Sequence, residues 1–266
     1  MDQKSKVARD ASGSSKALTK GLALVDLLAV HARGLRLAEV IREADVPKGT
    51  ALRLLDALIE AGLVRCDDAG TYRLGPQAAV WGSAFLDHLD IRTEAQDLLA
   101  HLAEISGETA HLGILDGLRI LYIDKIDSPH SLRMFSRVGA TNPLYCTGLG
   151  KAILAFTPPQ TVDEVIASGF TRRTENTITD GESLHAELAR IRRLGYSLDD
   201  VENEDGVRCV GAPVFDHRGR PVAALSVAGP ESRMTRERVA DLAPRIAAAG
   251  LDLSARLGYS GGARAS

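Results

Sequence analysis

The sequence predicts an α+β protein in two parts, a small helical head that carries a hairpin and a larger part in which helices pack on an antiparallel sheet. Residues 35–75 show apolar positions at helical spacing and then two short alternating runs, which is the pattern of the head. From Gly107 on, alternating runs are joined by turns and separated by helical patterns, without the repeated strand–helix–strand order of a parallel sheet. The chain has 266 residues, of which 45% are hydrophobic, so it is long enough for two ordinary domains with packed cores.

The head begins with a predicted helix that Thr19 caps and that a strongly apolar stretch continues. Two further helices follow, with Pro47 in the first turn of the second one and Gly62 at its C-terminal end. Their apolar positions are Leu37, Val40 and Ile41 in one helix and Leu54, Leu55, Leu58 and Ile59 in the other. Residues 63–66 and 71–74 are two short alternating runs around a turn-forming loop. The order of helix, turn, helix and hairpin is typical of a winged helix-turn-helix.

Such a head predicts binding to double-stranded DNA, because its last helix enters the major groove with the N-terminal turns foremost. We expect Lys48, Thr50 and Arg53 to lie at base edges and phosphates, and Arg65 and Arg73 of the hairpin to contact backbone phosphate. The alternative is that the head is only a protein-interaction module whose charged helix face is solvated.

Composition and charge limit the possible partners. The net charge is −3, with 12 Lys and Arg against 10 Asp and Glu in residues 1–80 and 20 against 25 in the rest of the chain. The weak positive bias of the head predicts modest non-specific affinity for DNA and therefore binding by more than one head. No apolar run reaches the roughly 18 residues that a membrane span needs, and the polar N-terminus lacks the apolar core of a secretory signal. We therefore expect a cytoplasmic protein without a membrane partner.

The three cysteines, Cys66, Cys146 and Cys209, are far apart and form no CxxC pair. This arrangement fits a reducing compartment and argues against a disulfide or zinc framework. His101 and His111 do not have metal-ligand spacing, so we predict no metal site and no cofactor.

The larger part follows a predicted connecting helix from Pro76 to about Thr93, in which the lone Trp81 packs within the chain or against a second subunit. A second capped helix is expected to end at Ile105. Two apolar runs then meet at Asp116-Gly117, a strong hairpin signal. The remaining predicted helices span residues 149–156, 182–194 and 236–257, and the remaining predicted strands span 196–201, 207–216 and 221–229.

Two stretches give the sequence a specific resemblance. PLYCTGLGKAILAF (residues 143–156) and GYSLDDVENEDGVRCVGAPVFDHRGRPVAALSVAGP (195–230) closely resemble the effector-binding domain of IclR-type transcriptional regulators, and the head matches the same family. The resemblance spans about residues 18–258. It implies a winged-helix head, a linker helix and a ligand-binding domain similar to GAF or PAS sensors, assembled as a homodimer or a dimer of dimers. It also implies repression or activation of a nearby catabolic operon in response to a small carboxylate effector.

The resemblance and the element pattern together predict five segments: a disordered arm over residues 1–16, the winged helix-turn-helix over 17–76, the linker helix over 77–95, the effector-binding domain over 96–259 and a disordered tail over 260–266.

The family's ligand site can be placed on this chain by matching positions. Gly148 and Leu149 fall where the family presents backbone N–H groups to the effector's carboxylate, in the way that a turn entering a helix does. The polar positions of the pocket are Asp199, Cys209 and Ser226, and its apolar side is Leu132 and Met134. The chain has Ala228 where the compared family member has a second Ser. The loss of this hydroxyl group and the apolar side at Leu132 and Met134 favour an acid that is bulkier or more apolar than a two-carbon one, such as an aromatic or sugar-derived carboxylate.

The head also departs from the family, with Gly49 where Ser is frequent and Leu52 where His or Tyr is frequent. Two other functions stay open. An enzyme could use Cys146 or Cys209 as a nucleophile with Asp199 and a histidine, but no nucleophile motif such as GxSxG is present and TGLGK is a poor phosphate loop, so we expect no catalytic residue. The other alternative is an interaction protein, or a constitutive DNA-binding protein, whose sensor domain no longer binds a ligand.

Overall fold

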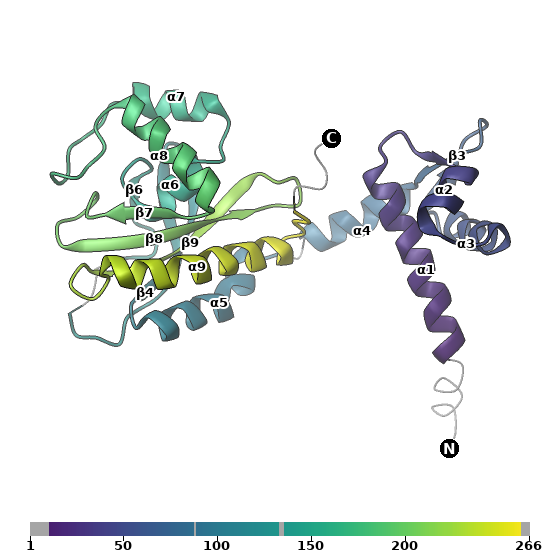
Figure 1. Cartoon of the computed structure of the whole chain (residues 1–266), viewed down its shortest axis with the longest axis horizontal. Coiled ribbons are helices and arrows are strands. Elements are labelled where there is room, and N and C mark those ends of the chain that lie inside the picture. The colour runs from purple at the N-terminus through teal and green to yellow at the C-terminus, as the bar shows by residue number, and fades with distance from the viewer. Residues whose placement is uncertain (1–10, 88, 133–135, 262–266) are drawn as a thin grey trace, which may run out of the picture. The chain divides into compact units, whose positions relative to one another are not determined.

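The computed structural model describes residues 11–87, 89–132 and 136–261 (Figure 1). The chain divides into two compact units, and the boundary along the sequence lies between Leu89 and Asp90.

The first unit is a bundle of helices with a three-stranded sheet. Its elements are α1 (Ala11–Val30), β1 (Leu35–Arg36), α2 (Leu37–Ala44), α3 (Lys48–Glu60), β2 (Val64–Cys66), β3 (Thr71–Leu74) and α4 (Pro76–Asp87). Strand β3 lies between β1 and β2 and is antiparallel to both. The core joins α1, α2, α3 and the sheet, and its buried members are Leu24, Leu28, Leu35, Val40, Leu55 and Val64. These elements form a winged helix-turn-helix.

The predicted helices α2 and α3 and the hairpin β2–β3 match the structure, and Gly62 has a positive φ of 72° just beyond the end of α3. Pro47 is not in the first turn of α3, as predicted, but is its N-cap residue, because the helix begins at Lys48. The predicted start at Thr19 was wrong, because α1 already begins at Ala11. Helix α1 therefore includes residues 11–16 of the expected disordered arm, and residues 1–10 lie outside the described part. Ile59 is 38% exposed and does not belong to the core stripe of α3.

Helix α4 ends at Asp87, and the next helix, α5 (Ile91–Ser106), begins after a new cap at Asp90. The Asp90 carboxylate accepts the Arg92 N–H at 3.0 Å, which is the usual way for a helix start to satisfy a free donor. The expected linker over residues 77–95 thus comprises parts of two helices.

The second unit is built on a six-stranded antiparallel sheet in the order β6-β5-β4-β9-β8-β7. Its strands are β4 (Thr109–Asp116), β5 (Arg119–Ile126), β6 (Thr141–Pro143), β7 (Ser197–Asp200), β8 (Val207–Phe215) and β9 (Pro221–Pro230). Its helices after α5 are α6 (Gly148–Leu154), α7 (Pro159–Ala167), α8 (Gly181–Leu194) and α9 (Arg236–Arg256). Helices α5 and α9 cover one face of the sheet, and α6 covers the other face, with α7 and α8 packed outside it (Figure 1).

The antiparallel sheet and most bounds of the predicted elements match the sequence prediction, including the end of α8 at Gly195 with φ 76°. The β4–β5 turn is displaced by one residue, since Asp116 pairs with Arg119 and the turn residues are Gly117 and Leu118. Gly117 alone has a positive φ, 57°, which is the glycine position of a type II′ turn. Strands β1 and β6 and helix α7 had not been predicted.

Candidate functional site

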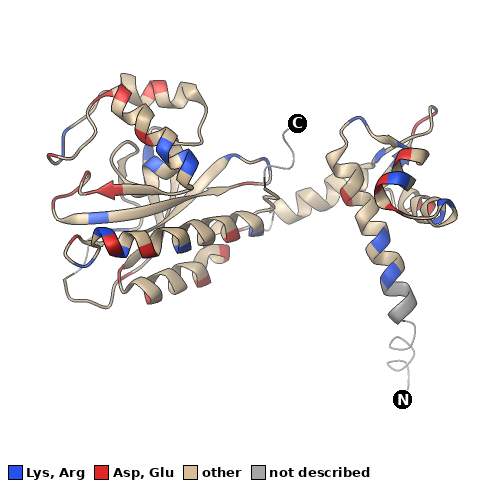
Figure 2. Cartoon of the chain, in the orientation of Figure 1, with Lys and Arg blue, Asp and Glu red and all other residues tan. Residues whose placement is uncertain are grey.

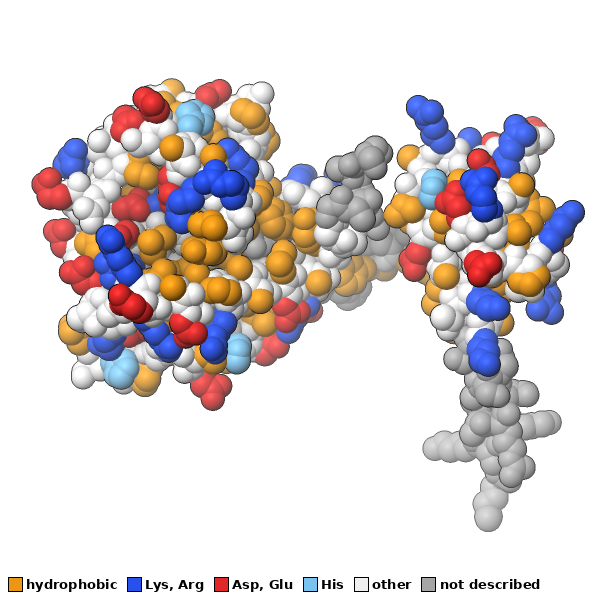
Figure 3. Space-filling view, in the orientation of Figure 1, with side chains coloured by type: hydrophobic (Ala, Val, Ile, Leu, Met, Phe, Trp, Pro, Cys, Tyr) orange, Lys and Arg blue, Asp and Glu red, His pale blue; other side chains and the backbone are white. Residues whose placement is uncertain are grey.

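The outer face of α3 carries the residues that were predicted to read DNA. Lys48 and Arg53 are exposed, and Thr50 is half-buried on the flank of the helix. Asp56 is also exposed, but it lies nearer the C-terminal end. The basic residues therefore occupy the N-terminal half of the helix, which is the half that a helix-turn-helix presents to base edges. Figure 2 marks the Lys and Arg positions along the ribbon of the head, and Figure 3 shows that their side chains project from several parts of its surface.

The hairpin holds its two arginines in different ways. Arg65 and Arg73 are direct partners across β2 and β3, and Arg65 is exposed. The Arg73 side chain is held by two hydrogen bonds within the head, since its Nη1 lies 2.8 Å from Asp67 Oδ2 and its Nε donates to Arg33 O at 3.0 Å. The pKa of Asp67 is lowered, first by the hydrogen bond from the Thr71 N–H and also by the Arg73 charge. Arg73 thus braces the turn of the hairpin, while Arg65 projects freely toward solvent.

In the second unit, the sheet register brings together polar residues that are far apart in sequence. Asp199 on β7 pairs with Cys209 on β8, and Cys209 pairs with Ala228 on β9. Ser226, two residues before Ala228, pairs with His111 on β4. Paired residues and residues two apart face the same side of a sheet, so all five side chains lie on the face that α6 covers. Together with Gly148 of α6, they line a closed cavity, called here the inner cavity.

Helix α6 approaches this sheet closely because glycine occupies the contact positions. A Cβ atom at Gly148 would lie 2.7 Å from Cys209 Sγ, and one at Gly211 would lie 2.5 Å from Gly148 O. Thr147 caps the helix, since its Oγ1 accepts the Gly150 N–H at 3.1 Å. The first N–H groups of α6, those of Gly148 and Leu149, have no acceptor within the helix. Of these two residues, Gly148 lines the inner cavity.

Asp199 is the carboxyl group of the inner cavity and is only 4% exposed. Its Oδ1 accepts the N–H groups of Glu202 at 2.7 Å and Asn203 at 3.3 Å. Burial, and then the nearby charge of Glu202, raise the pKa of Asp199 to about 7. A carboxyl group in this state can donate a hydrogen bond to an anion when it is protonated.

A fully buried lysine, Lys151, contacts residues on both sides of Asp199 in the sequence. Lys151 Nζ donates to Leu198 O at 2.6 Å and lies 2.5 Å from Glu202 Oε1 and 3.4 Å from Glu187 Oε1. Burial raises the pKa of Glu202, while the Lys151 charge opposes that rise. Lys151 therefore connects α6 to the β7–β8 loop that holds Asp199, and sequence reasoning had given it no role.

Two buried polar atoms of the inner cavity, Ser226 Oγ and His111 Nδ1, make no hydrogen bond of good geometry, although Ser226 lies close enough to the Cys209 thiol to act on its pKa. Both residues are 1% exposed. The other nitrogen of His111, Nε2, lies 2.8 Å from Ser136 Oγ, and burial lowers the pKa of the imidazole to about 3, so the ring is neutral at pH 7. Buried polar groups normally find a partner, and these two point to a ligand that supplies one. His111 had not been predicted as a site residue.

The structure thus unites Gly148, Asp199, Cys209 and Ser226 of the predicted pocket, and Leu149 follows directly in α6. It does not bring Leu132 to them, since that side chain is 69% exposed and does not line the cavity. Met134 lies outside the described residues.

The two thiols near the cavity have the wrong chemistry for a nucleophile. Burial, and then the charge of Asp199, raise the pKa of both Cys146 and Cys209 to about 12. Both therefore stay protonated at neutral pH, whereas the thiolate is the reactive form. Within the described ranges, no group of three or more His, Cys, Asp or Glu could hold a metal ion, and no helix is long and apolar enough to cross a membrane.

The fold and these two sites define a class of protein, a DNA-binding regulator with a separate sensor unit. The family model of the IclR helix-turn-helix domain matches residues 17–68, and that of the C-terminal domain of bacterial IclR transcriptional regulators matches residues 83–255. The chain belongs to the IclR family of transcriptional regulators.

Its relatives are regulators, not enzymes. The chain is 35% identical to the HTH-type transcriptional regulator BhcR of Paracoccus denitrificans over 91% of its own length and 88% of that protein's. It is 32% identical to the transcriptional repressor IclR of Escherichia coli, with coverages of 94% and 92%. The crystal structure of the Agrobacterium tumefaciens repressor BlcR is similar with a TM-score of 0.78 at 30% identity, covering 93% of this chain and 99% of that one. Pseudomonas aeruginosa HmgR is similar with a TM-score of 0.75 at 28% identity, with coverages of 91% and 97%.

Proposed function

We propose that this regulator binds a small organic acid in the inner cavity and that the acid changes its affinity for an operator next to a catabolic operon. The observation that carries the proposal is the convergence of two unpartnered buried atoms, Ser226 Oγ and His111 Nδ1, on a cavity that also contains Asp199 and the start of α6. The N–H groups of Gly148 and Leu149, with the dipole of the helix start, favour a carboxylate there.

Ser226 and protonated Asp199 would donate hydrogen bonds to the acid's oxygens. The acid's negative charge would further favour the protonated form of Asp199, so binding takes up a proton when the pH lies near or above the pKa of about 7. The thiol of Cys209 would form a neutral wall of the site.

The free volume of the inner cavity is about 10 Å³, which is room for roughly one water molecule. An organic acid therefore requires a more open form of the site. A ligand shifts an equilibrium only when it binds two states with different affinities. In this proposal the two states are the closed form, which has no room for the acid, and the open form, which binds it.

DNA binding in this proposal uses Lys48, Thr50 and Arg53 at base edges, with Arg65 at backbone phosphate. Arg73 contributes by fixing the hairpin turn through Asp67. An Arg53→Ala variant should lose its preference for the operator over scrambled DNA, and retained preference would exclude Arg53 as a base-reading residue.

We further propose that the chain acts as a homodimer or a dimer of dimers through apolar surface in the first unit. The exposed apolar side chains there belong to α1 and α4 and include Leu18, Leu22, Val80, Trp81 and Phe85, with exposures between 47% and 64%. This number of exposed large apolar side chains on two helices favours contact with a second copy, and two heads would also supply the affinity that one weakly basic head lacks. Sedimentation of the wild type and of a Trp81→Ser variant tests this assembly.

The effector is tested by calorimetric titration of a panel of small carboxylates. Binding that Ser226→Ala weakens supports the inner cavity as the site. If no acid binds the wild type while operator binding persists, the alternative of a regulator with a ligand-silent sensor is favoured.

A further inference from the structure

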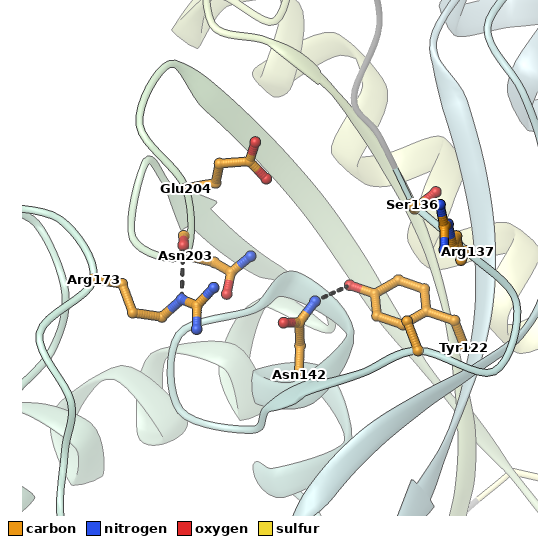
Figure 4. Close-up of a pocket in the computed structure, with 8 residues that line it drawn as sticks. Tyr122, Ser136, Arg137, Asn142, Arg173, Asn203 and Glu204 are labelled. Carbon is orange, nitrogen blue, oxygen red and sulfur yellow. Dashed lines mark hydrogen bonds between the residues drawn. The ribbon is translucent and has the colours of Figure 1, made fainter.

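A second pocket, called here the outer pocket, adjoins the inner cavity and has a volume of about 330 Å³. Tyr122 and Asn203 line both spaces, so the two share a wall. Figure 4 shows Arg173 and Asn203 on one side of the outer pocket, Ser136 and Arg137 on the other, and the Asn142 amide directed toward the Tyr122 hydroxyl between them. The Asn142 nitrogen donates to this hydroxyl at 3.3 Å.

The lining of the outer pocket is polar and positively charged. It contains the guanidinium groups of Arg137 and Arg173 and one carboxylate, that of Glu204. Among the residues that the structure describes, no carboxylate lies within ion-pair distance of Arg173. The apolar wall that Leu132 was expected to supply is absent from this lining, since Leu132 is exposed elsewhere.

One hydrogen bond orients Arg173, which is an exposed residue of the outer pocket. Its Nε donates to Asn203 O at 2.9 Å, which fixes the plane of the guanidinium and leaves the two Nη groups for another acceptor. A guanidinium held in this way can bind a carboxylate with two parallel hydrogen bonds.

The same residue, Asn203, connects Arg173 with the inner cavity. Its carbonyl group accepts from Arg173, and its N–H group donates to Asp199 Oδ1 at 3.3 Å. The acid-binding groups around Asp199 and the guanidinium of Arg173 are therefore held by one short segment of the β7–β8 loop.

We propose that the effector carries two anionic groups, one bound in the inner cavity and the second bound by Arg173 in the outer pocket. This inference rests on the proposed function of the inner cavity, and it narrows the effector class from small organic acids in general to dicarboxylates or acids with a terminal phosphate. Glu204 sets a limit on the second group, because it repels an anion that extends beyond the reach of Arg173.

The experiment titrates the full chain by calorimetry with matched linear acids: butanoate and succinate, pentanoate and glutarate, hexanoate and adipate. Phosphoglycolate is added to distinguish a phosphate from a carboxylate as the second group. The variants are Arg173→Gln, Arg173→Lys and Ser226→Ala. Arg172→Gln is the matched control, because it removes the same charge from the neighbouring residue, which is exposed like Arg173 but does not line the pocket.

We expect at least one diacid to bind about 10- to 100-fold more tightly than its matched monoacid, as for a hydrogen-bonded charge pair. Arg173→Gln should reduce this ratio to near one, Arg173→Lys should keep part of it, and Arg172→Gln should keep all of it. Ser226→Ala should weaken both members of each pair.

Equal binding of monoacids and diacids by the wild type would overturn the second anionic group and leave the proposed function in place. Diacid binding that Ser226→Ala does not affect would overturn the two-part site. If none of the acids binds, this inference and the acid-sensing function both fail, whereas operator binding remains testable by itself.

Discussion

The close contact between α6 and β8 makes Gly148→Ala a sharp test of how the inner cavity is built. Gly148 has no positive φ, so alanine is compatible with the backbone and only the space around the new Cβ matters. That atom would lie 2.7 Å from Cys209 Sγ and 3.4 Å from both Cys209 O and Gly211 N. Since heavy atoms pack at about 3.5–4.0 Å, α6 or the sulfur must move by roughly 1 Å.

Overpacking of this kind in a buried site costs about 1–3 kcal/mol. Alanine regains at most ~1 kcal/mol of helix propensity, because Gly148 is the first residue of α6. A net loss of about 1–2 kcal/mol corresponds to a fall of about 2–8 °C in the melting temperature of a unit of this size. Effector affinity should fall as well, because the first N–H groups of α6 move with the helix.

Differential scanning calorimetry measures the melting of the second unit in the wild type, in Gly148→Ala, in Cys209→Ala and in the double variant. Cys209→Ala removes the sulfur atom, so the double variant should be more stable than the sum of the single effects by about 1 kcal/mol or more. Gly49→Ala, followed through the melting of the first unit, is the control for a glycine-to-alanine change near a helix start without overpacking, since its Cβ meets nothing within 4 Å. Full stability of Gly148→Ala, or additive effects in the double variant, would refute the account of a helix held against β8 by glycine.

Three further predictions concern the carboxyl network and the hairpin. Because the pKa of Asp199 is raised to about 7 in the folded state, the folded chain binds more protons than the unfolded chain between about pH 4 and 7, and this group lowers stability as the pH rises through that range. Melting temperatures of Asp199→Asn should therefore decline less with pH than those of the wild type, and parallel curves would contradict the raised pKa. Lys151→Met leaves Glu202 buried without its partner, so the free energy of unfolding measured in urea should fall by about 3–5 kcal/mol and recover in part in Lys151→Met/Glu202→Gln. A single variant as stable as the wild type would show that the ion pair is dispensable. Arg65→Ala should weaken binding to operator and scrambled DNA alike and reduce the salt slope by about 1, whereas an unchanged slope would remove Arg65 from the phosphate contacts.

Much of the fold could be predicted from the sequence because its signals are local. The apolar spacing of α2 and α3, the glycine after α3 and the alternating runs of β8 and β9 each depend on residues within one segment. The two-residue strand β1 could not be predicted in this way, because it exists only through pairing of Leu35 and Arg36 with β3. Thr19 resembled a helix cap because its neighbours are apolar, yet the helix continues through it.

The candidate site was predictable only in part, for a related reason. The resemblance placed Gly148, Asp199 and Ser226, but His111 is a single histidine in a strand and has no local signal. Its place at the cavity depends on the register of β4 against β9. Lys151 is a residue type that is normally exposed, and its complete burial depends on Glu202 and Leu198 O, both distant in sequence.

The most direct test of the account is a fluorescence anisotropy titration of the protein against the DNA upstream of its own gene, in excess scrambled competitor, with and without each small acid. We expect saturable binding that the competitor does not remove and that one acid shifts in the wild type but not in Ser226→Ala. No preference over the scrambled DNA would contradict the DNA-binding function. Specific binding that every acid leaves unchanged would contradict the acid-sensing role of the inner cavity.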